Sequence, residues 1–94
     1  MINITAEQQS ILDSALAKWG VKDNMLITIE ELSEMIDVIS KNIGLKQVDN
    51  ADKIPDAIAD VLVVMNVAMQ AYKIPESEVQ KIFDEKISRL KAKL

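Results

Sequence analysis

The sequence of 94 residues contains no cysteine and no histidine, and it has one residue each of Trp, Tyr and Phe. The lack of cysteine excludes disulfides, thiolate nucleophiles and cysteine-based metal sites. The lack of histidine removes the commonest general base and zinc ligand. Any chemistry must therefore use carboxylates. With only two glycines and two prolines as well, the composition disfavours a strand-rich sandwich.

The charge balance is acidic, with 15 acidic residues against 11 basic ones and a net charge of −4. This disfavours binding to nucleic acid, which requires neutralisation of phosphates. The chain does not open with a basic region and an apolar stretch, so no signal peptide is expected. The most apolar run, Ile58 to Ala71, is shorter than the roughly 20 residues of a membrane span. We therefore expect a cytoplasmic protein with neither membrane nor nucleic acid as a partner.

Hydrophobic residues make up 49% of the chain and recur at helical spacing, which predicts a single all-α domain over residues 1–94. The capping box Thr5-Ala6-Glu7-Gln8 begins the first of four helices, and Gly20 ends it. The others are predicted over residues 24–43 or 28–43, 55–72 and 75–94, with a loop at 45–53. The third helix is apolar around most of its circumference, which is typical of the centre of a bundle.

The second predicted helix carries a heptad-like seam whose members step alternately by four and three residues. They are Met25, Ile29, Leu32, Ile36, Ile39 and Ile43. The last helix carries another apolar stripe, and these surfaces exceed what one small chain can cover. We therefore expect the four-helix bundle to complete its core by oligomerisation, with a dimer as the minimum.

Four acidic residues on two predicted helices are candidate metal ligands. Glu31 and Glu34 share a face of the second helix, with no basic residue between them. Asp56 and Asp60 lie four residues apart on the polar stripe of the third helix. In an antiparallel pair of helices these acids could converge on one cation or a pair, and oxygen-only ligands suit magnesium or manganese.

The same acids also have a purely structural explanation, which the spacing supports equally well. In this explanation Glu31 completes a capping box that starts at Thr28. Asp60 pairs with a lysine such as Lys86, and Asp56 stabilises a helix N-terminus.

Two short motifs carry a resemblance to a known family. The segment Glu30-Glu31-Leu32-Ser33-Glu34 fits the pattern EExxE, and Asp60 falls where a second pattern, ExxD, ends. The flanking Lys18-Trp19-Gly20 and the Glu85-Lys86 pair with Arg89 fit as well. From about Ala15 to Leu94 the chain resembles the MazG-like all-α nucleoside triphosphate pyrophosphohydrolases, in particular the short single-domain members common in phages and bacteria.

This resemblance implies a magnesium-dependent hydrolase that converts a nucleoside triphosphate, ribo or deoxyribo, to the monophosphate and pyrophosphate. The resemblance also implies a house-cleaning role in the nucleotide pool, and a homodimer or homotetramer with active sites near the interface. Carried over, Glu31, Glu34 and Asp60 become metal ligands, and Glu30 or Glu34 orients the attacking water.

Basic and aromatic residues are candidates for contacts with such a substrate. Lys41, Lys86 and Arg89 could neutralise phosphates, although each is more simply a solvated helix residue. Trp19 could stack on a base, although a core position is favoured for a lone tryptophan at a helix end.

The sequence departs from the family pattern at two places. Ala57 occupies the position of the motif's second glutamate, and we hypothesise that Asp56 replaces that ligand. Met25 stands where related sequences often carry a glutamine near the site. The departures leave a second hypothesis open, a catalytically weak or silent helical oligomer that binds a nucleotide or a protein partner.

Overall fold

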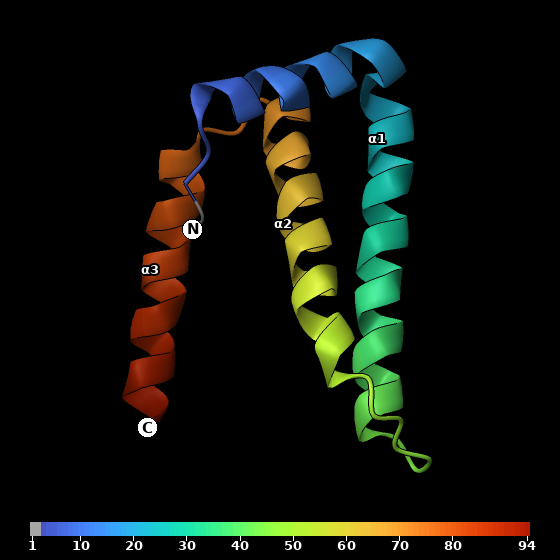
Figure 1. Ribbon diagram of the computed structural model, residues 1–94. Helices are drawn as coiled ribbons and strands as arrows, with labels where there is room; N and C mark the ends of the chain where they lie inside the picture. Colours follow the sequence, from blue (N-terminus) through green and yellow to red (C-terminus); the bar gives the residue numbers. More distant parts are fainter. Residues whose placement is uncertain (1–2) are drawn as a thin grey trace.

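A computed structural model of the chain describes residues 3–94. In this part of the chain there are three α-helices, α1 (Ala6–Ile43), α2 (Ile54–Ala71) and α3 (Glu76–Lys93), and no strand. A short 3-10 helix, η1 (Ala51–Lys53), precedes α2. The all-α prediction is confirmed (Figure 1), but the predicted count of four is not, because α1 takes in the first two predicted helices.

Helix α1 bends at Gly20, where the sequence predicted an end. The capping box at Thr5 is formed as predicted. Gly20 has φ 79° and ψ 172°, a backbone region open essentially to glycine alone. Helical structure resumes directly, and Figure 1 shows the first part of α1 crossing the ends of α2 and α3 before the chain turns to run alongside α2.

Asn24 explains why the bend does not become a loop. Its side-chain nitrogen donates to the carbonyl oxygens of Ala15, at 3.3 Å, and Gly20, at 2.6 Å. The bend leaves backbone carbonyls without the N–H donors that a continuous helix would provide. The buried side-chain amide of Asn24 provides hydrogen-bond donors in their place. Thr28 donates to the Asn24 carbonyl at 2.9 Å, so the helix runs through Thr28 without a new start.

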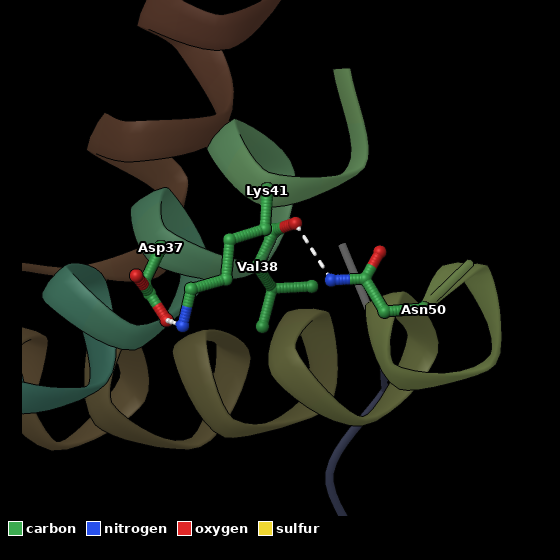
Figure 2. A network of polar contacts seen from close by, with 4 residues as sticks. All are labelled: Asp37, Val38, Lys41 and Asn50. Carbon is green, nitrogen blue, oxygen red and sulfur yellow. Dashed lines mark hydrogen bonds and ion pairs between the residues drawn. The ribbon is translucent and has the colours of Figure 1, made fainter. Parts of the chain in front are cut away.

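The connection between α1 and α2 is tied to α1 by a buried asparagine. The Asn50 side-chain nitrogen donates to the Val38 carbonyl at 3.1 Å (Figure 2). Its side-chain oxygen accepts from Asn42 at 3.1 Å. At the end of α1, Gly44 has an ordinary φ of −72°. Glycine is favoured at position 44 for a steric reason, because a Cβ there would lie 2.8 Å from the Ser40 carbonyl oxygen.

Helices α1 and α2 form an antiparallel pair (Figure 1). Pro55 lies in the first turn of α2, as predicted, where its missing N–H costs nothing. Ala57, Val64 and Val67 form the buried hydrophobic core on one face of α2. Other apolar residues of α2 are open, among them Val63 at 53% exposure. Helix α2 lies between α1 and α3 (Figure 1), but the burial expected of a central helix is not complete within a single chain.

The face of α1 that packs towards α2 differs from the heptad seam. It includes the buried Asn24 and Thr28 and the half-buried Glu31, Met35 and Val38. The seam itself is open to solvent along most of its length, with Ile36 66% exposed. Within the described residues, most of the seam is therefore left uncovered.

Helix α3 stands apart, on the side of α2 away from the second part of α1 (Figure 1). Only Val79 and Gln80 are half-buried, and the other α3 residues are exposed. The radius of gyration over the described residues is 15.7 Å, against about 12 Å for a compact domain of this length. The chain is thus an open arrangement of helices.

Helix α2 and η1 together form a stretch, Ala51–Ala71, whose length and mean hydropathy of 1.4 would be sufficient to cross a membrane. The helical stretch is longer than the apolar run that the sequence indicated. It also carries Asp56 and Asp60, and Asp60 lies within the acidic cluster described below.

Candidate metal centre

Three of the predicted acidic residues lie together between α1 and α2. Glu31 and Glu34 of α1 and Asp60 of α2 each place a carboxylate oxygen within 4.8 Å of the other two. Spacing of three residues puts both glutamates on one side of α1, and the antiparallel packing of α2 brings Asp60 to them. We call these three residues the acidic cluster.

Glu31 is the member of the cluster with a buried, unpartnered carboxylate oxygen. It is half-buried, whereas Glu34 is exposed, and its Oε2 atom is buried without a hydrogen-bond partner. Burial raises the pKa of Glu31 above its ordinary value, and the nearby charges of Asp60 and Glu34 raise it further. The folded chain thus holds a carboxylate that lacks a compensating positive charge.

Basic residues do not provide that charge within residues 3–94. The ion pair found there joins Lys41 Nζ to Asp37 Oδ2 at 2.9 Å on the exposed side of α1 (Figure 2). The alternative in which Asp60 pairs with Lys86 is therefore wrong. The alternative in which Glu31 completes a capping box is also wrong, because α1 does not begin at Thr28.

Asp56 and Ala57 occupy the turn of α2 that precedes Asp60. Asp56 is exposed and is not part of the acidic cluster, and its place in the first turn suits the helix dipole. Ala57 is buried, at 8% exposure. Lying one turn before Asp60, it occupies the contact between α1 and α2 with a side chain that offers no ligand.

The other predicted site residues lie outside the cluster. Glu30 is an exposed neighbour on α1, and Lys41 is held by Asp37. Lys86 and Arg89 are exposed on α3. Trp19 lies directly before the bend, and it is 52% exposed. The Lys18 ammonium lies 5.1 Å from the centre of its ring, so Trp19 is not a core residue of the single chain.

A line of polar residues on the packed face of α1 was not predicted. Asn24, Thr28 and Glu31 step by four and three residues and continue through Met35, Val38 and Asn42. This second heptad-like stripe runs beside the apolar seam. Its helical period is detectable in the sequence, although the sequence analysis singled out only Glu31 of these polar residues for this face.

Two hollows lie away from the cluster, between the first part of α1 and α2. One, of about 390 Å³, is mainly apolar and is lined by residues that include Leu12, Leu62 and Asn66. Another, of about 450 Å³, is more polar and includes Gln9 and Gln70 in its lining. The acidic cluster lines neither.

The chemistry available to the cluster follows from its donors. Three carboxylates provide oxygen ligands of the kind that hard divalent cations such as Mg²⁺ and Mn²⁺ prefer. A cation between them would also remove the repulsion that the three negative charges exert on one another. Comparison of the chain with family models, with curated proteins and with solved structures found no match.

Proposed function

We propose that this protein is a magnesium-dependent nucleoside triphosphate pyrophosphohydrolase, which converts a ribo- or deoxyribonucleoside triphosphate to the monophosphate and pyrophosphate. The observation that supports it best is the acidic cluster, in which Glu31, Glu34 and Asp60 lie within 4.8 Å of one another. The buried Oε2 of Glu31, which lacks a partner, is the part of the cluster that a bound cation would satisfy.

The acidic cluster would hold Mg²⁺, or Mn²⁺ in its place. When bound, such an ion neutralises phosphate oxygens and makes a water molecule more acidic. Asp56, one turn before Asp60 on α2, is the candidate for an additional ligand. Its shorter side chain would have to replace the glutamate that Ala57 does not provide.

In the proposed reaction the oxygen of a water molecule forms a bond to the α-phosphorus. The bond from that phosphorus to the bridging oxygen breaks, and pyrophosphate leaves with the electron pair. Glu34, the exposed member of the cluster, or its exposed neighbour Glu30 would orient the water and accept its proton. Both carboxylates face solvent, which gives a proton a route away from the site.

Positive side chains would be needed for the phosphates. Lys86 and Arg89 are exposed and unassigned to an ion pair within the described residues, whereas Lys41 would have to leave Asp37. Trp19 is open enough to stack on a base. A cytoplasmic role in cleaning the nucleotide pool is part of the proposal, with nucleotides rather than nucleic acid or a membrane as partners.

The buried Ala57 favours a second candidate, a helical protein that binds a nucleotide or a protein partner without turnover. Because Ala57 provides no carboxylate, the site has less negative charge with which to bind a cation. Weaker cation binding would lower the rate of hydrolysis. This candidate retains the cluster as a binding site and differs only in the rate of the chemical step.

The decisive experiment incubates the purified protein with a panel of ribo- and deoxyribonucleoside triphosphates, with magnesium or with a chelator, and separates the products by chromatography. We expect monophosphate and pyrophosphate only with magnesium, and at least a hundredfold less product from Glu34→Gln. Glu78→Gln, at an exposed acid of α3, is the matched control. Absence of product from every nucleotide would overturn the hydrolase and favour the silent binding protein.

A further inference from the structure

We propose that the two hollows between the first part of α1 and α2 form one binding site for a small aliphatic amine in its ammonium form. The hollows adjoin, because Asn3, Ile4 and Asn66 line both of them. Together they offer a polar end for the charged group and an apolar end for the carbon chain. This site is separate from the acidic cluster, and it does not depend on the hydrolase activity.

The polar hollow is lined by amide side chains whose nitrogen atoms already donate hydrogen bonds within the chain. The Asn66 nitrogen donates to the Leu62 carbonyl at 2.8 Å. The side-chain nitrogens of Gln9 and Gln70 donate to one oxygen of Asp13, at 3.1 Å and 2.6 Å. A carbonyl or a carboxylate only accepts hydrogen bonds, so these contacts determine which end of each amide carries the oxygen. The oxygens of Gln9, Asn66 and Gln70 are therefore the amide atoms left for a ligand.

A lining of this kind selects a ligand that donates hydrogen bonds. Amide oxygens accept hydrogen bonds and do not donate them. Glu76, which also lines the polar hollow, adds a carboxylate to these acceptors. An ammonium group has three N–H donors and no acceptor. It therefore matches the lining better than a hydroxyl group or a carboxylate does.

The charges near the polar hollow also favour a cation. Asp13, which holds Gln9 and Gln70, and Glu76 in the lining are both acidic. Within residues 3–94 neither of these acids takes part in an ion pair, and no basic residue lines either hollow. The whole chain has a net charge of −4, which attracts cations over longer distances. An anionic ligand would be repelled here.

The apolar hollow provides the place for a carbon chain. Its walls include Ile4, Leu12, Leu62 and Val63, and the first three of these are half-buried. A metal ion gains nothing from such walls, whereas an alkyl chain leaves water when it enters them. The volumes, about 390 Å³ for this hollow and about 450 Å³ for the polar one, are within the range of small-molecule sites. The pair of hollows therefore selects an organic cation.

The first test is isothermal titration calorimetry of the wild type at pH 7 with n-hexylammonium, 1-hexanol and hexanoate, which share a chain and differ in the end group. We expect the ammonium ion to bind at a saturable site, at least tenfold more tightly than the other two. Because each buried methylene adds to binding, n-octylammonium should bind about tenfold more tightly than n-hexylammonium. No binding, equal binding of hexanol or hexanoate, or no gain from the longer chain would overturn the proposal.

The second test locates the site with variants. Asn66→Leu keeps the size of the side chain but removes its oxygen, and it should weaken binding of n-hexylammonium at least tenfold. Gln80→Leu, at a residue of α3 that lines neither hollow, and Asp60→Asn, in the acidic cluster, should bind as the wild type does. Weaker binding by Asp60→Asn with no change in Asn66→Leu would place the amine at the acidic cluster and overturn the site.

A third test remains decisive if Asn66→Leu does not fold, because it uses the wild type alone. Side-chain amides of asparagine and glutamine give their own signals in a nitrogen-15 correlation spectrum. Titration with n-hexylammonium should shift the signals of Asn66 and Gln70 saturably. The signal of Gln47, which is exposed in the connection between α1 and α2, should not move. Equal shifts at all three residues, or none at Asn66 and Gln70, would overturn the proposal.

Discussion

Glu31 of α1 and Asp60 of α2 place carboxylate oxygens within 4.8 Å of each other, and burial together with the charge of Asp60 raises the pKa of Glu31. The two residues come together only when the helices pair, so their repulsion is a property of the folded state. The chain therefore loses stability at this contact unless a proton or a cation neutralises it. This relationship connects the fold to the proposed function.

The first prediction concerns the pH dependence of stability without divalent cations. The pKa of Glu31 in the folded state lies above its ordinary value of 4.5. At a pH between 4.5 and the folded-state pKa, the folded protein therefore holds this proton more tightly than the unfolded chain does. The destabilisation by Glu31 is complete above the folded pKa. It is relieved as the pH falls through that value, and it is absent below 4.5.

Glu31→Gln isolates this effect from the other carboxyl groups. Measured by urea unfolding in chelator, the variant should be more stable than the wild type at pH 7, and the difference should disappear near pH 4.5. Glu30→Gln, at the exposed neighbour outside the cluster, should follow the wild type. A constant difference between Glu31→Gln and the wild type at every pH would contradict the raised pKa.

The second prediction concerns the bend in α1. Gly20 has a φ of 79°, and nothing lies within 4 Å of a Cβ built there. Gly20→Ala should therefore lower the free energy of unfolding by about 1–3 kcal/mol through backbone strain alone. A D-alanine introduced at position 20 by chemical ligation adds the same methyl group and favours positive φ, so it should restore most of the loss. Equal stability of the L- and D-alanine proteins would be evidence against the bend.

The third prediction concerns the missing ligand at position 57. A glutamate in place of the buried Ala57 overpacks the contact between α1 and α2, at a cost of about 1–3 kcal/mol, and adds charge beside the acidic cluster. In chelator, Ala57→Glu should therefore melt below the wild type. Magnesium should raise its melting temperature more than that of the wild type, because the new carboxylate adds a ligand.

Ala59→Glu is the control for position 57, because Ala59 is exposed on α2. Magnesium should affect this variant no more than the wild type. If Ala57→Glu responded to magnesium no better than Ala59→Glu, position 57 would not face the cluster. In the nucleotide assay, a gain of activity in Ala57→Glu would indicate that the wild-type enzyme is weakened by the missing ligand. No change would indicate that Asp56 already acts as the additional metal ligand.

Helix existence and most helix ends were predictable because local signals determine them. The capping box at Thr5, Pro55 in a first turn and the end of α1 before Gly44 all appear in the structure. The interpretation of Gly20 as a stop was wrong for a non-local reason. Asn24 supplies the hydrogen bonds that let the helix resume, and a side-chain contact of this kind is not visible in periodicity.

The acidic cluster was predictable, whereas the burial of the polar residues that pack beside it on α1 was not. Glu31 and Asp60 were singled out because unpaired acids on otherwise apolar helices are rare. The chain packs Asn24 and Thr28 beside Glu31 against α2, whereas the seam through Ile29 and Ile36 stays open. A sequence does not distinguish a seam that closes within one chain from one that closes between two copies, because both have the same period.

The most direct measurement of the central claim is Mn²⁺ binding, followed by electron paramagnetic resonance, in the wild type and in Asp60→Asn. If Glu31, Glu34 and Asp60 form a metal site, the wild type binds the ion at a saturable site, and Asp60→Asn weakens that binding at least tenfold. Asp84→Asn, at an exposed acid of α3, leaves it unchanged. Equal binding by all three proteins, or none by the wild type, would contradict the site.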